Sequence, residues 1–307
     1  MTQNIRTIFD QNIQLLGAMD KSVYYFREQQ YDKAMYLVAH SMDTIKLIIE
    51  AIITNREYFQ LVDTKSMLEM LAGILEAKKN QDYILLADLL ELQLINFLIG
   101  VQELIIGKEE VVFEEEHYKE NIRALKSNGI GFEQLEESIE TSKLLEGGYR
   151  IEFTSCGQMT LAAENEGKSF YFHTNNKIQS EAFLLAKNWF QKDIKRYHVY
   201  GLGLGYHIGE LRSLDKDVEI FIYESDMNVV QLACAFTDIK ELFITQKTQV
   251  IYDPEFHLLK ARMEIMNKKD KFIVHLPSYK NIRTEIGKNL LQEILPKTLV
   301  VKTSESE

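Results

Sequence analysis

The chain has 307 residues, of which 46% are hydrophobic, a composition typical of globular rather than disordered proteins. This length is sufficient for two ordinary hydrophobic cores, so we expect two domains. The cysteines, Cys156 and Cys234, are too few for a disulfide framework or a cysteine-rich metal site, and they favour a reducing compartment.

Charge is distributed unevenly along the sequence. Residues 1–148 carry 14 Lys and Arg against 25 Asp and Glu, whereas residues 149–307 carry 21 of each class. Binding to nucleic acid requires a basic face, so we predict no nucleic-acid partner. The N-terminal sequence MTQNIRTIFD lacks the basic and apolar regions of a secretory signal, which predicts a cytoplasmic location.

Residues 1–106 are predicted to form an antiparallel helical bundle. Prolines occur only at 254, 277 and 296, and helical periodicity predicts helices at 3–29, 31–56, 64–79 and 82–106. The apolar stripe of the second helix consists of Ala34, Val38, Ser41, Ile45, Ile48 and Ile52. We expect this bundle to self-associate or to bind a protein partner.

The fourth predicted helix is apolar enough to be compared with a membrane span. Its stripe consists of Tyr83, Ala87, Leu90, Leu94, Phe97, Val101 and Leu104. The same helix carries polar side chains that would be costly in lipid, namely Asp88, Glu91, Asn96 and Glu103. We therefore predict the central helix of the bundle and no membrane span.

Residues 107–148 are predicted to be an acidic helical connector. Glutamates are concentrated at residues 109–116 and again at 133–140. Runs of this kind are usually a solvated face, so we favour that interpretation over a metal or acid–base site. Two short helices separated at Asn128-Gly129 would fit the segment.

Residues 149–307 are predicted to form a β-meander followed by a Rossmann-like α/β domain with a parallel sheet. The alternating runs YRIEFTS, QMTLAAE and KSFYFH predict three strands, and a helix is expected at 179–191. The strands YHVY, VEIFIY, TQVIY and KFIVHL then alternate with helical segments, and a last strand is predicted at residues 298–301.

The principal functional motif is the glycine-rich loop at residues 201–205, which follows a predicted strand and precedes a helical run. Gly201 permits a tight turn, Gly203 permits close approach of a ligand, and Gly205 relieves the packing of helix on strand. The helix N-terminus offers amide groups and a positive dipole end to a phosphate or carboxylate. The loop therefore predicts a nucleotide-binding site.

Several residues near this loop are further candidates for ligand contacts. Tyr206 and His207 lie in the first helical turn, where a neutral imidazole can donate a hydrogen bond to an anion. Glu224 ends the next strand, and a carboxylate there can accept both ribose hydroxyls. A tight turn with a charged helix start explains the same pattern without a ligand.

The ends of the later strands add three more candidates. Asp253 ends the third strand and could contact a base, although Asp-Pro is also an ordinary start of a turn. His275 and Ser278 follow the fourth strand, at the edge where open α/β sheets bind ligands. His275 could equally be an ordinary strand residue.

The segments YFHTNNKIQSEAFLLAKNWF, YHVYGLGLGYHIGELRSL and VEIFIYESDMNVVQLACAFTDI resemble bacterial motility accessory factors and archaeal 6-hydroxymethylpterin diphosphokinase-like proteins, over roughly residues 149–280. The resemblance implies a Rossmann-type transferase that uses nucleotide-activated sugars in flagellin modification, or that moves diphosphate from ATP to a pterin. The resemblance also implies which residues form the binding motif: Gly201, Gly203, Gly205, Tyr206, His207 and Glu224, with His173-Thr174 and Glu181-Ala182 before them.

We therefore expect a nucleotide-dependent, glycosyltransferase-like enzyme whose ligand is a nucleotide or nucleotide sugar, with Mg²⁺ accompanying its phosphates. Two alternatives stay open: an S-adenosylmethionine-dependent methyltransferase or diphosphokinase on the same fold, and a non-catalytic scaffold or ligand-sensing protein. Val199 argues against the methyltransferase, because such enzymes commonly carry an acidic residue two positions before the first glycine. The sequence assigns no catalytic residue and predicts no dedicated set of metal ligands.

Overall fold

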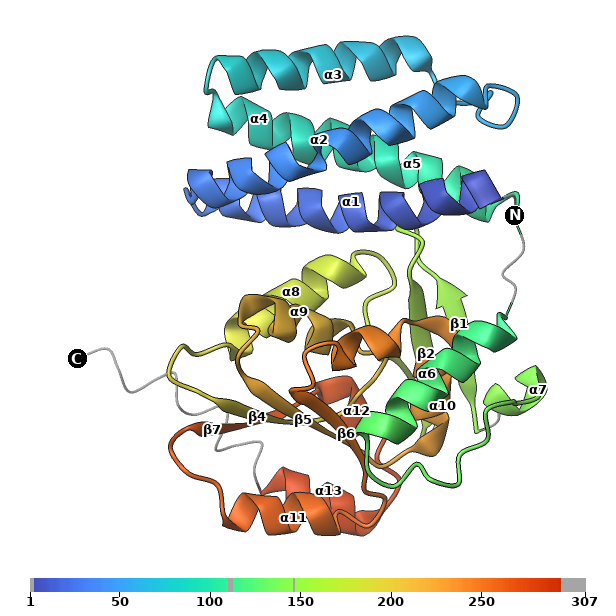
Figure 1. The fold of residues 1–307 in the computed structure, drawn as a ribbon, viewed down its shortest axis with the longest axis vertical. Coiled ribbons are helices and arrows are strands. Elements are labelled where there is room, and N and C mark those ends of the chain that lie inside the picture. Colours follow the sequence, from blue (N-terminus) through green and yellow to red (C-terminus); the bar gives the residue numbers. More distant parts are fainter. Residues whose placement is uncertain (1–2, 110–112, 146, 294–307) are drawn as a thin grey trace. The chain divides into compact units, whose positions relative to one another are not determined.

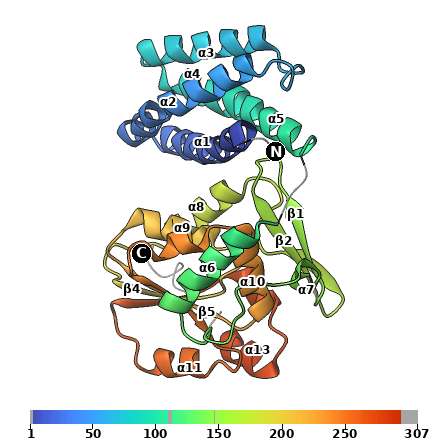
Figure 2. The same cartoon turned by 45° about the vertical axis from the view of Figure 1, so that its right-hand side comes forward.

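A computed structural model describes residues 3–109, 113–145 and 147–293. The described chain divides into two compact units, one formed by residues 3–109 with 153–158 and 175–180, and the other by the remaining residues (Figures 1 and 2). Cys156 and Cys234 are both free and buried. The strand predicted at residues 298–301 lies outside the described residues.

The first unit is helical, as the periodicity predicts. Its helices are α1 (Gln3–Arg27), α2 (Tyr31–Thr54), α3 (Thr64–Lys79), α4 (Tyr83–Leu89) and α5 (Ile95–Ile106). A π-helical segment, Leu90–Leu94, joins α4 to α5. Asp63 precedes α3 as its N-cap residue, and its carboxylate accepts hydrogen bonds from the amides of Lys65 and Ser66.

The core of this unit contains the stripe predicted for the second helix. The buried residues of α2 are Ala34, Val38, Ser41, Ile45, Ile48 and Ile52, which confirms the prediction. One polar bridge is buried with them. Asn12 of α1 donates hydrogen bonds to the Leu98 carbonyl and to Oε1 of Gln102, both at 2.8 Å, and so holds α1 against α5.

Of the stripe predicted for the fourth helix, Ala87, Leu90, Leu94 and Val101 are buried, whereas Tyr83, Phe97 and Leu104 are only partly buried. After Leu94 the buried face also includes Leu98 and Ile105, one position beyond Phe97 and Leu104. The reason is the π-helical turn, in which the Ile95 amide donates to the Leu90 carbonyl five residues earlier. Such a turn holds one extra residue, so the apolar stripe shifts by one position.

The run Tyr83–Ile106 is, among the described residues, long and apolar enough to cross a membrane by length and composition alone. Two of its acidic residues, Asp88 and Glu91, instead form ion pairs with Arg27 of α1, at 2.6 Å and 2.8 Å. These pairs support its place as a bundle helix, because carboxylates are costly in lipid. The absence of a membrane span and the cytoplasmic location stay predictions.

The second unit is an α/β region, as predicted. A small sheet of order β1-β2-β3 comprises β1 (Tyr149–Phe153), β2 (Met159–Asn165) and β3 (Lys168–Tyr171). The larger sheet comprises β4 (Arg196–Tyr200), β5 (Glu219–Glu224), β6 (Thr248–Tyr252) and β7 (Asp270–Val274). The helices are α6 (Glu115–Asn128), α7 (Thr141–Leu144), α8 (Ile178–Trp189), α9 (Tyr206–Leu214), α10 (Met227–Phe236), α11 (His257–Glu264), α12 (Leu276–Lys280) and α13 (Glu285–Gln292), with a 3₁₀ helix at Ile239–Phe243.

The larger sheet is parallel throughout and has the order β6-β5-β4-β7. Helices α11 and α13 cover one face, and α6, α9 and α10 lie on the other (Figures 1 and 2). Tyr200 and Phe272 belong to one buried cluster with Leu259 of α11 and Leu291 of α13. The strands are buried on both faces, which is why they are continuous hydrophobic runs in the sequence.

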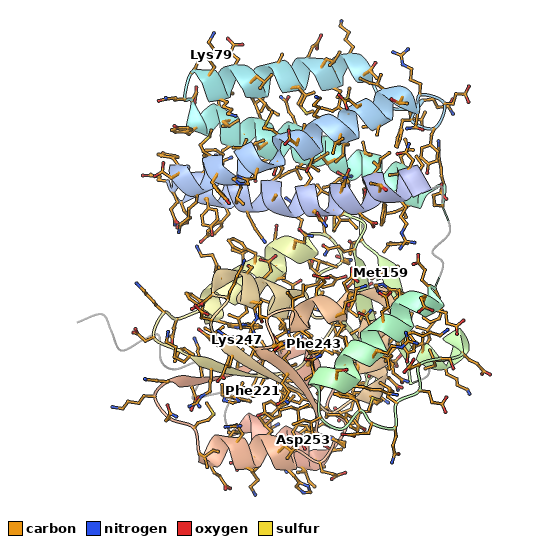
Figure 3. The ribbon with its side chains drawn as sticks, viewed as in Figure 1. Lys79, Met159, Phe221, Phe243, Lys247 and Asp253 are labelled. Atoms are coloured by element: carbon orange, nitrogen blue, oxygen red, sulfur yellow. The ribbon has the colours of Figure 1, made fainter. Side chains whose placement is uncertain are left out.

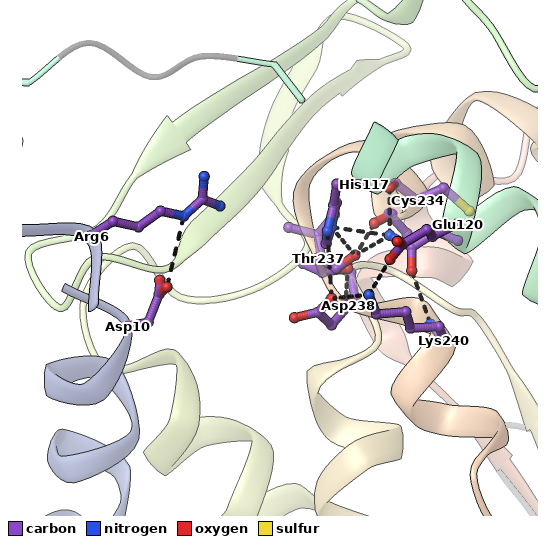
Figure 4. Close-up of polar contacts among 11 residues, drawn as sticks. Arg6, Asp10, His117, Glu120, Cys234, Thr237, Asp238 and Lys240 are labelled. Carbon is purple, nitrogen blue, oxygen red and sulfur yellow. Dashed lines mark hydrogen bonds and ion pairs between the residues drawn. The ribbon is translucent and has the colours of Figure 1, made fainter. Parts of the chain in front are cut away.

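Helix α6 lies within the segment predicted to be an acidic connector, and it packs on the second unit. Asn121 is fully buried, and its amide donates to the carbonyls of Cys234 and Thr237, both at 2.8 Å. Nearby, Glu120 forms an ion pair with Lys240 (Figure 4). The polar face of α6 therefore reaches solvent while its other face completes the α/β unit.

The chain after α6 also joins the sheet. Gly129 follows the helix, and Ile130 forms a parallel bridge with Ile251 of β6. The amide of Ile130 donates to the Val250 carbonyl at 2.9 Å. The break predicted at Asn128-Gly129 is thus the point where the chain passes from helix to sheet edge.

Candidate functional site

The carboxyl ends of the four parallel strands meet at one edge of the sheet. Gly201 follows β4, and its amide donates to the Tyr223 carbonyl of β5. His275 follows β7, and its amide donates to the Tyr200 carbonyl of β4. Asp253 follows β6 at the same edge. The parallel arrangement therefore gathers residues that are far apart in the sequence.

The order of the strands reverses beside β4. From β4 the chain adds β5 and then β6 on one side, and β7 returns to pair with the other side of β4. In open α/β sheets the crevice at such a reversal is where ligands bind, outside the carboxyl ends of the strands. The loop at residues 201–205 and His275 lie on the two strands that flank this reversal.

The three loop glycines have the positive φ values that favour glycine: +106°, +50° and +83° for Gly201, Gly203 and Gly205. Two of them face side chains of the protein itself. A Cβ at Gly201 would lie 2.3 Å from the Cβ and Oγ of Ser278, and one at Gly203 would lie 2.8 Å from Nε2 of His173. An imidazole therefore occupies the approach to Gly203 that the sequence assigned to a ligand.

The last glycine of the loop begins α9. A Cβ at Gly205 would lie 3.1 Å from Cδ1 of Ile239, so this glycine relieves the packing of α9 against the 3₁₀ helix rather than against a strand. The Tyr206 hydroxyl donates to the Met159 carbonyl of β2 at 3.0 Å. Met159 is labelled in Figure 3, and this bond fixes the start of α9 relative to β2.

Glu224 is 2% exposed and anchors the glycine-rich loop to β5. Its Oε2 accepts a hydrogen bond from the Leu202 amide at 3.0 Å, and its Oε1 accepts from the amides of Ser225 and Asp226 at 2.9 Å and 3.1 Å. Burial raises the pKa of Glu224 to about 7, although the Leu202 amide opposes this rise. A carboxylate offers about four acceptor positions, and three are occupied by these amides, so one position is left for a hydroxyl donor of a ligand.

Asp253 has a local structural role. Its Oδ2 accepts a hydrogen bond from the Leu259 amide at 2.8 Å, in the first turn of α11. The side chain, which is labelled in Figure 3, is therefore committed to holding the start of that helix. This geometry matches the turn interpretation of Asp-Pro rather than contact with a base.

Three imidazoles meet beside the glycine-rich loop. His173 comes from the segment after β3, His207 from the first turn of α9, and His275 from the residue that precedes α12. Their ring centroids lie 4.3 Å apart for His207 and His275, 5.4 Å for His173 and His275, and 5.7 Å for His173 and His207. All three side chains are buried.

Hydrogen bonds determine which nitrogens of this histidine cluster carry protons. Nε2 of His207 lies 3.1 Å from the Gly201 carbonyl, so it donates, and Nδ1 of the same ring has a lone pair. Nδ1 of His275 lies 2.8 Å from Oγ of Ser278. Nδ1 of His207 and Nε2 of His275 are buried without a hydrogen-bond partner. Each such atom typically costs about 1–3 kcal/mol of stability.

The cluster is electrically neutral near pH 7. Burial lowers the pKa of His207 to about 4, although its hydrogen bond to the Gly201 carbonyl opposes this shift. Burial, and then repulsion from neighbouring imidazoles, holds the pKa of His173 and His275 well below the usual range of histidine, although the Phe172 backbone opposes the shift of His275. Neutral imidazoles with free lone pairs are the form in which histidine binds metal ions.

Sequence reasoning treated these histidines separately. His207 and His275 were candidates for ligand contacts, and His173 was implicated only through the family resemblance. The available signal was that His207 and His275 follow two strands that can be neighbours in a parallel sheet. No spacing pattern points to His173, because it is brought in by the small sheet.

The first unit carries a separate groove between α3 and α5, with a volume of about 690 Å³. Its lining is mostly apolar and includes Met67, Met70 and Phe97, with Leu61 at 79% exposure on the connecting segment. Self-association or partner binding through this unit stays a prediction.

Comparison with known proteins concerns the helical unit alone. A family model described as "Domain of unknown function (DUF8042)" matches residues 3–104, about a third of the chain. No curated protein and no solved structure matches the sequence. The carboxyl edge of the sheet lies outside the matched residues, so its chemistry is argued from its geometry.

Proposed function

We propose that the second unit is a Rossmann-like domain that binds a nucleotide or nucleotide sugar at the carboxyl edge of its sheet, as part of a nucleotide-dependent transferase. The observation that carries this proposal is the position of loop 201–205. It leaves an inner strand beside the reversal of strand order and leads directly into α9. The N-terminal end of α9 lies at this loop, and the positive end of the helix dipole favours a phosphate there.

Glu224 supplies the second half of the proposed site. It ends β5, the strand beside β4, and a carboxylate at that position can accept the hydroxyl groups of a ribose. Because its pKa is raised to about 7, the side chain changes from carboxylic acid to carboxylate across neutral pH. We therefore expect nucleotide affinity to increase between pH 6 and pH 8, as the better acceptor forms.

The transferase part of the proposal comes from the resemblance to motility accessory factors. In such a reaction the protein would hold the nucleotide, with Mg²⁺ neutralising its phosphates, and orient the group that is transferred. Electrostatic stabilisation by α9 would contribute to the same step. The proposal assigns no general base.

The experiment is a thermal-shift titration of the full-length protein with ATP, CTP, CMP, a CMP-activated sugar and S-adenosylmethionine, at pH 6 and pH 8. Ligand binding to the native state stabilises it by RT ln(1 + L/Kd), where L is the free ligand concentration, so the unfolding temperature rises as L exceeds Kd. We expect one nucleotide to stabilise the protein, and Glu224→Gln to weaken its binding by about tenfold, which is about 1.4 kcal/mol. Glu219→Gln, at the exposed start of the same strand, is the matched control. Stabilisation by S-adenosylmethionine alone would instead select the methyltransferase.

A second candidate is a non-catalytic ligand-sensing or scaffold protein. The observation in its favour is that Gly201 and Gly203 face Ser278 and His173 of the chain itself, so the loop has a structural reason for its glycines. If none of these compounds changes the unfolding temperature at millimolar concentration, this candidate replaces the transferase.

A further inference from the structure

The histidine cluster consists of His173, His207 and His275, and the proposed nucleotide site assigns no role to these side chains. One nitrogen from each ring lies within 4.8 Å of the other two, and the group contains no carboxylate. We propose that these three histidines bind one first-row transition-metal ion, with Zn²⁺ as the best match. The inference is independent of nucleotide binding.

The first argument is the direction of the unused nitrogens. Nδ1 of His207 and Nε2 of His275 are fully enclosed, and neither meets the full geometry of a hydrogen bond, although the Phe172 backbone lies close enough to His275 to oppose the lowering of its pKa. Buried polar atoms nearly always have a hydrogen-bond partner, so two nitrogens without one in the same cluster indicate a specific ligand. A metal ion can accept both lone pairs once one ring turns, because the two rings are stacked with an interplanar angle of 13° and their in-plane lone pairs run nearly parallel.

The second argument is the support given to the opposite nitrogens. Metal-binding histidines usually donate their other N–H to a carbonyl, carboxylate or water, which fixes the tautomer and the ring. His207 donates from Nε2 to the Gly201 carbonyl, and Nδ1 of His275 lies beside the Ser278 hydroxyl. These contacts leave Nδ1 of His207 and Nε2 of His275 as the nitrogens available to an ion.

His173 would be the third ligand, and its binding to the ion would break an existing hydrogen bond. Its Nε2 accepts a hydrogen bond from the Leu204 amide at 3.0 Å. The same nitrogen cannot direct its only lone pair at both the amide and a metal ion. Metal binding through Nε2 would therefore release the Leu204 amide, which lies in the glycine-rich loop, and we expect that amide to exchange with solvent faster in the loaded protein.

The donor set selects the class of metal. Imidazole suits Zn²⁺, Cu²⁺, Ni²⁺ and Fe²⁺, whereas Mg²⁺ and Ca²⁺ require oxygen ligands. Three histidines with a fourth position for water are the ligand set of several catalytic zinc sites. An ion here would tie the loop after β4 to the segment after β7 and to His173.

The test uses the full-length protein, purified without a histidine tag and depleted of metal. We expect one equivalent of Zn²⁺ in a competition titration with a chromophoric chelator, and one equivalent of Co²⁺ with the visible absorption of a four-coordinate imidazole site. His207→Gln and His275→Gln should each weaken Zn²⁺ binding by at least about tenfold. His198→Gln, which removes another fully buried histidine from β4, is the matched control and should leave binding unchanged.

X-ray absorption of the Zn²⁺-loaded wild-type protein gives a measurement that does not depend on the variants folding. Two or three imidazoles around the ion support the site. The proposal is overturned if the metal-depleted wild type binds no stoichiometric Zn²⁺, if fewer than two imidazoles surround it, or if both folded cluster variants retain full affinity.

Discussion

Gly201 carries two separate constraints at the candidate site. Its φ of +106° is a conformation that other residues rarely adopt, and a Cβ there would lie 2.3 Å from the Cβ and Oγ of Ser278. Backbone strain of this kind costs about 1–3 kcal/mol, and overpacking of a buried site costs a similar amount. The close contact between the loop after β4 and the segment after β7 therefore requires that residue 201 has no side chain.

We predict that Gly201→Ala lowers the free energy of unfolding by about 3–5 kcal/mol, because both costs act together. Urea denaturation measures the change. Gly167→Ala is the control, since Gly167 has a φ of +71° with nothing within 4 Å of an added Cβ, so strain acts there alone. Adding Ser278→Gly to Gly201→Ala should recover part of the loss. A cost no larger than that of the control would mean that the two loops separate easily.

The individual site residues could be predicted from the sequence only where a strand or helix end fixed their position. Gly201 follows β4 and Glu224 ends β5, and both strands are hydrophobic runs in the sequence, so their place at one edge of the sheet was predictable. The contacts they make were not, because Ser278 lies in the short helix α12 and His173 in the segment after β3, and neither segment has a periodic pattern. Contact between such segments depends on the packing of the whole sheet rather than on local propensity.

At the level of single elements, the π-helical turn at Leu90–Leu94 changes which side chains of the fourth predicted helix are buried. It joins two helical stretches whose apolar stripes are one residue out of step. A π turn arises when one residue is inserted into an α-helix. Periodicity alone could not locate it, because leucine and isoleucine occupy nearly every position nearby and either stripe fits the sequence.

This interpretation predicts that deletion of Leu92 is well tolerated. Leu92 is 64% exposed, and removing one residue from the π turn would restore an ordinary α-helix with both flanking stripes in phase. We expect a folded protein whose unfolding free energy falls by less than about 2 kcal/mol, within the range of ordinary substitutions. Circular dichroism and urea denaturation measure the outcome.

Deletion of Leu47 in α2 is the matched control for that experiment. This leucine is 50% exposed but lies in a regular α-helix, so its loss turns every later residue by about 100°. Ile48 and Ile52 would then leave the core, and the unit should fail to fold cooperatively. Equal effects of the two deletions would contradict the role given to the π turn.

The acidic segment after the bundle shows a second limit of sequence patterns. Composition describes the solvent side of α6 well, since Glu115, Glu116 and Glu120 are exposed. It gives no sign that Asn121 is fully buried and bonded to two carbonyls at the end of α10. An asparagine in a charged helix resembles any surface residue until tertiary contacts are known.

At the scale of the whole molecule, three boundaries fall close together. The family match ends at residue 104, α5 ends at Ile106, and the continuous part of the first unit ends soon afterwards. Helical periodicity predicts a bundle that ends at residue 106, close to these three boundaries. The inclusion of residues 153–158 and 175–180 in the first unit was not predictable, because segments of six residues carry no periodic signal.

The stability of the whole molecule depends on pH through its buried histidines. His198, which lies outside the histidine cluster, is one example. This side chain is fully buried in β4 and stacks on Phe221, with Nε2 3.9 Å from Oδ1 of Asp270. Burial, together with Arg262 and Arg196, lowers the pKa of His198 to about 4, while Asp270 acts in the opposite direction. The folded chain therefore resists protonation that the unfolded chain accepts.

A folded-state pKa below the usual 6.5 means that the stability from neutral His198 is fully present above pH 6.5 and is lost as the pH falls toward 4. The shift to about 4 corresponds to roughly 3 kcal/mol across that window. His198→Gln cannot be protonated, so the wild type should lose about 2 kcal/mol more than this variant between pH 7 and pH 5. Urea denaturation at both pH values measures the difference, with exposed His40→Gln as the control. Parallel losses in the wild type and His198→Gln would place the acid sensitivity at other groups.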